Sequence, residues 1–557
     1  MNTTGTPTAT PAADASSWRS AGLALAVLVL LAEMAFAMLT TARAQTPTTD
    51  EPVYVSTAAV YLQQHSLRYN PEHPPLGKLI IGAGLIFAHP HLDPAFTGDQ
   101  SALGRHLLYE AGNDPWRLML YARLPMIIMT LLIGLVVFAF ARDLVGPVGG
   151  LVALTLYAFS PDLIAHGSLA TLDGPAAGFL LTSIWSLWRA RRQPLLYLPL
   201  AGVALGAAMA TRMSALAAVP VLLVLVVMSV QSAGPAHNVD KRTMWRQRGL
   251  GVLAAIGVAL IAVVVVWVTY FAVDPRLRWV SPQHAPLVGG LSGLLVDMLP
   301  FPQPFRDGLR IQLGFENSTF GGFLFGRQYQ GSLWYYLPAA LLVKTPLGML
   351  ALWLAGTIAL VTVPRLRAAA PYLLLPTAVL LAAALNESRN FGVRYVIFLP
   401  LFLAVAAATV VAFRYRWLPV LTAILVLFVA GSSLRTHPFY LAYSNEVFGG
   451  PAKTYLHLHD SNVDWGQDLG RLAERLHRRY PGQPVWLVYK GSGVPSYYGI
   501  VASDPLMVPL HQVRGLLVVS NSCISQPDRR LAALIDSSTP IDQVGHSITI
   551  FRRPGTG

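Results

Sequence analysis

The sequence is poor in cysteine and in charged side chains. It has one cysteine, Cys523, among 557 residues, which excludes an internal disulfide as the support of any exported domain. Only 12% of the residues are charged, against roughly 25% in an ordinary soluble domain. With 54% hydrophobic residues and a positive mean hydropathy, the composition indicates a polytopic membrane protein.

The formal charge of +13 does not indicate a nucleic-acid partner. The basic residues stand mainly in short loops between apolar runs, where they would set the orientation of the helices in a membrane. A nucleic-acid-binding domain would instead gather them on one face or along one helix.

Apolar runs of the length that a helix needs to cross a ~30 Å hydrocarbon core recur along the chain. They predict a mostly α, polytopic membrane helix bundle of about 11 spans, near 21–41, 118–141, 148–165, 174–190, 195–211, 214–230, 250–272, 333–361, 368–386, 393–413 and 417–434.

The basic clusters predict which ends of these spans are cytoplasmic. Arg19 and the clusters at 189–193, 240–248, 364–367 and 413–417 all fall on one side, and positive loops stay inside. The N-terminus is therefore expected inside, and the first span is expected to be a retained helix because no convincing small-residue cleavage site follows it. Residues 42–117, 273–332 and the tail from 435 are then expected outside the membrane.

The remaining segments are of two kinds. Residues 1–17 are rich in Thr, Ala and Pro and are expected to be a disordered cytoplasmic tail before the membrane module of residues 18–434. In the tail, residues 435–557, short apolar runs at 484–490, 514–522 and 547–553 alternate with a helical pattern at 468–480. This alternation predicts a small extracytoplasmic α/β domain.

Ionisable side chains gather at the predicted outer ends of the spans. They are Asp50, Glu51, Glu72, His73, Lys78, Arg123, Asp173, Arg212 and Arg394, whereas Glu33 and Lys344 lie deeper and are candidates to pair with each other. This distribution predicts a site at the outer membrane surface, because a transporter would carry such groups nearer the midplane.

Structural roles remain open for several of these residues. Asp50 and Asp173 both stand where a helix N-cap is expected, Arg212 could extend from the end of a span to the interface, and Lys78 and Arg123 could anchor it there. His73 is more constrained, because Pro74-Pro75 stiffens the backbone behind it. We expect this turn to bring His73 towards Asp50 in one cavity that Arg212 also lines.

The stretch 460–471 begins like a calcium loop, with acidic or amide side chains at alternate positions. The turn glycine is replaced by Trp465, and the closing acid is replaced by Arg471. The sequence therefore does not predict a calcium site there.

Several motifs carry a family resemblance. Asp50-Glu51, "EHPPLGK" (72–78), "TLDGP" (171–175) and "ATR" (210–212) resemble the dolichyl-phosphate-mannose protein mannosyltransferases and the lipid A aminoarabinose transferase, both C-type membrane glycosyltransferases. The segments 326–346, 391–401 and 460–469 resemble bacterial members. The β-trefoil of the eukaryotic mannosyltransferases is missing from this chain, so the resemblance leaves the acceptor open among protein, lipid and glycan.

The resemblance implies roles for particular residues. Asp50 would be the catalytic base, with Asp173 as the alternative, and Arg212 and His73 would stabilise the departing phosphate. Glu72 stands where the aminoarabinose transferase has a metal-contacting glutamate, so a divalent metal stays open, although one acid and one histidine make a poor site. The other candidates for substrate binding are Glu51, Lys78, Arg123, Lys344 and Arg394.

An outward-facing enzyme needs a donor that has already crossed the membrane, because nucleotide sugars are cytoplasmic. We therefore expect a polyprenyl-phosphate sugar as donor, a hydroxyl of a lipid, glycan or protein as acceptor, inversion at the anomeric carbon, and the bacterial cytoplasmic membrane as location. The alternatives are a surface-glycan ligase or polymerase, a lipid-linked sugar flippase, and a receptor whose active part is the exported tail.

Overall fold

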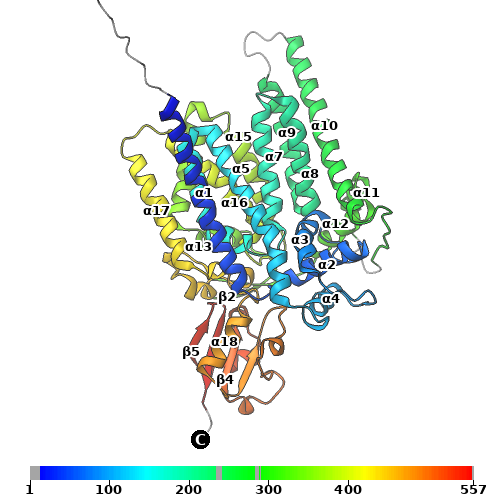
Figure 1. The fold of residues 1–557 in the computed structure, drawn as a ribbon, viewed down its shortest axis with the longest axis vertical. Helices are drawn as coiled ribbons and strands as arrows, with labels where there is room; N and C mark the ends of the chain where they lie inside the picture. Colours follow the sequence, from blue (N-terminus) through cyan, green and yellow to red (C-terminus); the bar gives the residue numbers. More distant parts are fainter. Residues whose placement is uncertain (1–12, 234–240, 283–287, 289, 555–557) are drawn as a thin grey trace, which may run out of the picture.

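The chain folds into a long helical bundle with a small α/β unit at one end (Figure 1). The structure is a computed structural model and describes residues 13–233, 241–282, 288 and 290–554. Most of the predicted disordered tail, residues 1–12, lies outside the described residues, whereas residues 13–17 already belong to the first helix. The predicted fold class, a mostly α bundle followed by a small sheet, is confirmed.

All eleven predicted spans coincide with helices. The corresponding elements are α1 (Ala13–Ala44), α5 (Pro115–Ala158), α6 (Pro161–Gly167), α7 (Asp173–Ala190), α8 (Pro194–Thr211), α9 (Val219–Ala233), α10 (Lys241–Val273), α13 (Tyr336–Lys344), α14 (Leu347–Thr362), α15 (Ala370–Leu385), α16 (Phe398–Ala408) and α17 (Leu418–Thr436). Within the described residues, six helices are long and apolar enough to cross a membrane, or seven if α13 and α14 form one bent span. The chain is a multi-pass membrane protein, and the number eleven stays a prediction.

Two long helical segments are interrupted at a glycine or a proline. Gly146 in α5 has φ +83°, a conformation that residues with a side chain rarely adopt, and Pro147 follows it. This break separates the predicted spans 118–141 and 148–165. Pro346 separates α13 from α14, which meet at an angle of 118°.

The predicted outer loops lie at the end of the bundle that carries the α/β unit, opposite the N-terminal end of α1 (Figure 1). The first loop contains α2 (Glu51–Gln64), α3 (Pro75–Ala88), α4 (Gln100–Arg105) and the π-helical turn η1 (His106–Glu110). The second contains α11 (Gly290–Met298), α12 (Gln303–Phe315) and the hairpin of β1 (Gly321–Leu324) and β2 (Arg327–Gln330).

The α/β unit contains a four-stranded sheet in the order β3-β4-β6-β5. Its elements are α18 (Leu469–Arg479), β3 (Val485–Val488), β4 (Gly515–Ser520), α19 (Asn521–Ser525), α20 (Arg529–Asp536), β5 (Thr539–Val544) and β6 (Ile548–Arg553). Strands β3 and β4 are parallel, and the other pairs are antiparallel. The sequence analysis missed β5, because "TPIDQV" at the sheet edge carries Pro, Asp and Gln instead of an apolar run.

Strand β4 forms the centre of this unit because both of its faces are buried. Leu516 and Val518 pack in one apolar cluster with Leu472 of α18, whereas Leu517 and Val519 pack in a second cluster with residues of α20. The α/β unit therefore begins at α18. Residues 437–467, which the sequence analysis assigned to it, form short turns before that helix.

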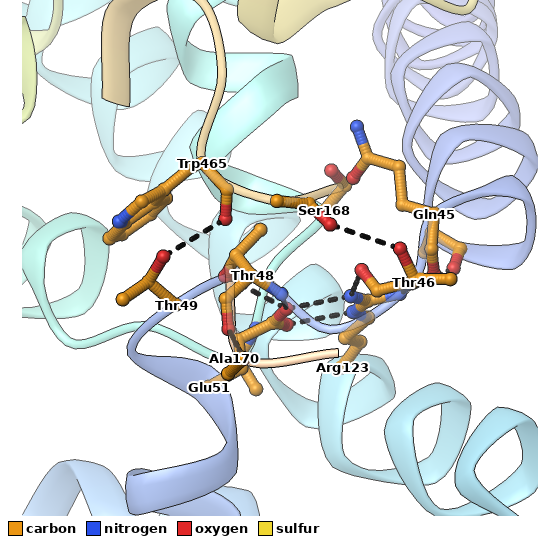
Figure 2. Close-up of polar contacts among 12 residues, drawn as sticks. Gln45, Thr46, Thr48, Thr49, Glu51, Arg123, Ser168, Ala170 and Trp465 are labelled. Carbon is orange, nitrogen blue, oxygen red and sulfur yellow. Dashed lines mark hydrogen bonds and ion pairs between the residues drawn. The ribbon is translucent and has the colours of Figure 1, made fainter. Parts of the chain in front are cut away.

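A buried ion pair fixes the start of the first outer loop (Figure 2). Both carboxylate oxygens of Glu51 accept hydrogen bonds from Arg123 of α5, at 2.7 and 2.6 Å. The carboxylate also accepts the backbone N–H of Thr48 at 2.9 Å and that of Ala170 at 2.8 Å. The two side chains are 0% and 1% exposed, so nearly all of their polar atoms are satisfied within the protein.

The guanidinium of Arg123 completes this network through the backbone. It donates to the carbonyl oxygens of Ala42, Gln45 and Thr46 at 2.7 to 3.1 Å, where the chain leaves α1. Burial would raise the pKa of Glu51, but the charge and hydrogen bonds of Arg123, with the two amides, lower it below 4.5. Glu51 therefore stays ionised, and the stability that it contributes is lost only as the pH falls through its lowered pKa.

We predict that Arg123→Ala destabilises the protein far more than the loss of an exposed ion pair. The substitution leaves a buried carboxylate without its counter-charge, which costs about 3–5 kcal/mol. Thermal unfolding in detergent measures the effect. Arg105→Ala is the matched control, since its pair with Glu110 is exposed and worth at most about 1 kcal/mol. Equal unfolding midpoints for the two variants would contradict the argument.

Topology gives a second prediction. If eleven spans follow an inside N-terminus, the α/β unit lies outside the cytoplasm. A reporter that works only in the cytoplasm should stay silent when it is fused after residue 557, and should be active in the loop 413–417. An active C-terminal fusion would mean that the number of spans is wrong by one.

Candidate active site

A cavity of about 370 Å³ lies where seven distant parts of the chain meet. Its walls come from the start of α2, the turn before α3, the start of α4, the end of α8, α12, the segment that follows α15, and the segment that precedes α18. They include Asp50, Tyr54, Asn70, Glu72, His73, Gln100, Arg212, Gln312, Arg389, Arg394, Tyr395, Asp460 and Trp465. The predicted juxtaposition of Asp50, His73 and Arg212 in one cavity is therefore confirmed.

Asp50 lies at the N-cap position of α2, but its side chain makes no capping hydrogen bond within the described chain. Oδ2 instead accepts a hydrogen bond from Arg394 Nη1 at 2.6 Å, and the side chain is 29% exposed. The capping role, left open by the sequence, is thus not the one that the side chain takes. Because Glu51 turns into the protein, Asp50 is the member of the acidic pair that faces the cavity.

Arg394 is fixed by aromatic rings on two sides. Its guanidinium carbon lies 4.4 Å from the centroid of the Trp465 ring and 5.1 Å from that of Tyr395. Such cation–π contacts orient the planar guanidinium while leaving its N–H groups free to bond in the plane. Arg394 therefore holds the carboxylate of Asp50 in one direction.

The position of His73 is set by the turn that precedes α3. The ammonium group of Lys78 donates to the carbonyl oxygen of His73 at 2.7 Å, to the carbonyl oxygen of Asn70 at 2.8 Å and to its side chain at 3.1 Å. The imidazole packs edge-on against Tyr54, with the ring centroids 5.5 Å apart. Lys78 thus supports the turn from behind and does not line the cavity.

The burial of His73 bears on the role at the phosphate that the resemblance implies for it. Burial lowers its pKa well below 6.5, and the neighbouring charges of Arg212 and Lys78 lower it further. Its Nδ1 is buried and has no hydrogen-bond partner within the described residues. A neutral imidazole with a free nitrogen offers a hydrogen bond to a ligand but no full charge.

Arg212 is not an exposed interface arginine. It follows the last residue of α8, forms an ion pair with Asp173 at the start of α7, and its side chain is only 18% exposed. Asp173 makes no capping hydrogen bond with its side chain in the described part of α7. It lines a smaller cavity of about 60 Å³ together with Arg212, rather than the cavity that contains Asp50.

A second cavity, of about 290 Å³, adjoins the first. His73, Arg212, Gln312 and Arg389 line both cavities. The other walls of the second cavity combine apolar residues, Met213, Leu216, Ala217, Leu309, Leu313 and Ala383, with the polar residues Ser214, Glu316, Asn386 and Glu387. The two cavities thus share a wall with two arginines, and the second cavity also contains two carboxylates.

The sequence analysis missed Arg389, Asp460 and Trp465. Arg389 donates to Gln312 at 3.0 Å and lies 3.6 Å from Glu316 of the loop after α12. The sequence did contain a signal for Arg389, because it lies in the short predicted outer loop between the spans 368–386 and 393–413. Asp460 and Trp465 both lie in the stretch 460–471, which begins like a calcium loop. Asp460 forms an ion pair there with Lys490, at 2.5 Å.

Four of the expected substrate-binding residues do not line these cavities. Glu51 and Arg123 satisfy each other, and Lys78 supports the turn of His73. Lys344 pairs with Asp162 at 3.4 Å and donates to the carbonyl oxygens of Leu441 and Asn462, so its expected partner Glu33 is wrong.

Glu72 lines the main cavity and accepts a hydrogen bond from Gln100 at 2.7 Å. In the part of the chain that the structure describes, no group of three or more His, Cys, Asp or Glu side chains could hold a metal ion. The residues around Glu72 therefore do not fit a metal site, and no chemical step is assigned to one.

Comparison with solved structures yields neighbours of low similarity. ArnT from Cupriavidus metallidurans bound to undecaprenyl phosphate has 15% identity and a TM-score of 0.47, covering 94% of this chain and 97% of that one. The protein O-mannosyltransferase Pmt1-Pmt2 of S. cerevisiae bound to the sugar donor has 14% identity and a TM-score of 0.36, covering 45% and 34%. The oligosaccharyltransferase AglB of Archaeoglobus fulgidus has 12% identity and a TM-score of 0.42, covering 82% and 58%.

Sequence comparison is more specific. A search of curated proteins finds no match. The model of the dolichyl-phosphate-mannose-protein mannosyltransferase family matches residues 26–275, just under half of the chain. This segment includes Asp50, His73, Asp173 and Arg212. The resemblance to C-type membrane glycosyltransferases of the mannosyltransferase type, which the motifs predict, is therefore confirmed.

Proposed function

We propose that this protein transfers a sugar from a polyprenyl-phosphate donor to an acceptor hydroxyl at the outer face of the cytoplasmic membrane. One observation carries the proposal: a carboxylate, Asp50, shares a cavity with Arg212, Arg389 and the unpaired imidazole of His73. Glycosyl transfer from a lipid phosphate requires this combination of a base and phosphate-binding groups.

In the proposed reaction, Asp50 accepts the proton of the acceptor hydroxyl as its oxygen attacks the anomeric carbon. The bond between that carbon and the phosphate oxygen breaks, and the lipid phosphate leaves with the electron pair. Direct attack from the opposite side inverts the anomeric centre. A positioned general base contributes typically ~10²–10⁴-fold to such a step. The hydrogen bond from Arg394 orients the carboxylate.

The phosphate would lie on the wall that the two cavities share. Arg212 and Arg389 supply positive charge there, and His73 supplies a neutral hydrogen bond when the proton is on its free nitrogen. Charge that develops on the leaving phosphate is then met by fixed groups in a water-poor site, which is the larger part of the expected rate enhancement. The apolar walls of the adjoining cavity suit the first isoprene units of the lipid.

The decisive test combines a donor panel with a substitution of the base. Purified protein is incubated with radiolabelled polyprenyl-phosphate sugars and membrane extract, and the labelled fraction identifies donor and acceptor. We predict that Asp50→Asn, whose side chain fills the same space, lowers the rate of transfer at least ~10²-fold while the donor still binds. Asp536→Asn, an exposed aspartate at the end of α20, is the matched control.

The same experiment separates the proposal from its rivals. A flippase would continue to move the lipid-linked sugar in Asp50→Asn, because it needs no base. A ligase or polymerase would label a growing surface glycan instead of a single acceptor. Substantial transfer by Asp50→Asn would remove Asp50 as the base.

Arg212 gives a further prediction about the donor. Arg212→Gln alone leaves Asp173 buried without its partner, so we combine it with Asp173→Asn to keep the pair neutral. The double variant should fold but bind the lipid phosphate about tenfold or more weakly, since one charge-assisted contact is lost. Arg416→Gln, an exposed arginine before α17, serves as the control. A donor affinity equal to that of the wild type would remove Arg212 from the phosphate site.

A further inference from the structure

A second basic cavity lies in the α/β unit, away from Asp50. It measures about 360 Å³ and is lined by four arginines of α18, Arg471, Arg475, Arg478 and Arg479, with one acid, Glu474, and Phe439. None of these residues lines the cavities described above.

The arginines share one face of α18 because of their spacing. Positions 471, 475, 478 and 479 are separated by four, three and one residues, which puts them along one side of a helix. The other side carries Leu469, Leu472 and Leu476, which pack on the sheet. The helix is therefore held by its apolar face, and its basic face is presented outward as a fixed row.

The carboxylates near this row leave much of its donor capacity unused. Asp542 accepts hydrogen bonds from a single nitrogen of Arg475, and Arg478 contacts Glu474 through a single nitrogen. Arg471 contacts Asp468, while its Nη2 is buried and has no hydrogen-bond partner in the described chain. A guanidinium has five N–H donors in a planar fork, so each arginine keeps donors for a tetrahedral anion.

The position of the cavity indicates which anion would reach it. Phe439, whose ring lies 4.9 Å from the guanidinium of Arg471, comes three residues after the end of α17. His437 beside it stacks on Phe36 of α1, with the ring centroids 6.1 Å apart. Both α1 and α17 are largely exposed apolar helices that could cross a membrane, so this edge of the cavity lies where a lipid headgroup would be.

The view of the whole chain agrees with this position. Helix α17 ends on the side of the bundle that carries the α/β unit, and α18 belongs to that unit (Figure 1). An arginine row next to the end of an apolar helix that could cross a membrane has the chemistry of a site for acidic headgroups.

We propose that the α18 cavity binds the phosphate of an anionic membrane lipid and thereby holds the α/β unit against the bilayer. Arginines attract the phosphates of an anionic surface electrostatically, and Phe439 supplies an apolar contact beside Arg471. This site differs from the proposed donor site in its residues, its position and its ligand. Binding there can be measured without any glycosyl transfer.

The test is binding of phosphatidylglycerol to the full-length protein in neutral detergent, measured by native mass spectrometry. Arg478→Gln/Arg479→Gln should weaken this binding by about tenfold, because two exposed arginines are lost while the pair of Arg475 with Asp542 stays intact. Arg514→Gln/Arg529→Gln, which removes two exposed arginines of the same unit outside the cavity, is the matched control.

A second variant tests the opposite direction. Glu474→Gln removes the acid from the cavity lining and should strengthen binding, and it guards against a loss that merely reflects misfolding. Phosphatidylcholine and glycerol phosphate distinguish a preference for anionic lipid from binding of any lipid or of free phosphate. Equal affinities of the cavity and control variants would overturn the proposal, as would equal binding of phosphatidylcholine. Tight binding of glycerol phosphate without the lipid preference would assign the cavity to a soluble anion and overturn the lipid role.

Discussion

The buried pair of Glu51 and Arg123 is the constraint on which the candidate site depends. An ionised carboxylate without contact to water must keep its counter-charge and its hydrogen bonds, so Glu51 has one allowed direction. Its neighbour Asp50 then faces the other way, into the cavity. The two consecutive acids thus have different roles. Glu51 is buried and fixes the backbone, and the backbone then directs the side chain of Asp50 into the cavity.

The same network joins the end of the chain to its beginning. The backbone N–H groups of Thr46 and Thr49 donate to the carbonyl oxygens of Gln467 and Trp465 at 3.0 Å. The hydroxyl of Thr49 also donates to the carbonyl oxygen of Trp465, at 3.2 Å (Figure 2). Trp465 in turn packs on Arg394, which holds Asp50. The segment before α18 is therefore part of the site, and a tail separated from the bundle would lack the cavity that Asp50 lines.

The sequence predicted the positions of the bundle helices well, because apolar runs of about 20 residues have few alternatives to a helix in a membrane. The approach of His73 to Asp50 was also predictable, since a Pro-Pro turn restricts the backbone. The pairing of Lys344 was not, because helix positions alone do not tell whether a lysine meets Glu33 or Asp162. Arg389, Asp460 and Trp465 reach the cavity from distant segments, and only the folded chain shows them together.

The three arginines of the candidate site each have a carboxylate partner, and this bears on how a phosphate could bind. Arg394 is paired with Asp50, Arg212 with Asp173, and Arg389 lies 3.6 Å from Glu316. These pairs lower the cost of burying each arginine before a ligand arrives. A donor phosphate on the shared wall would draw Arg212 and Arg389, whose partners lie outside the main cavity. Arg394 would stay with Asp50, so the base would keep its orientation while the phosphate binds. The positions of their carboxylate partners therefore decide which arginines would bind the phosphate, Arg212 and Arg389, and which one orients the base, Arg394.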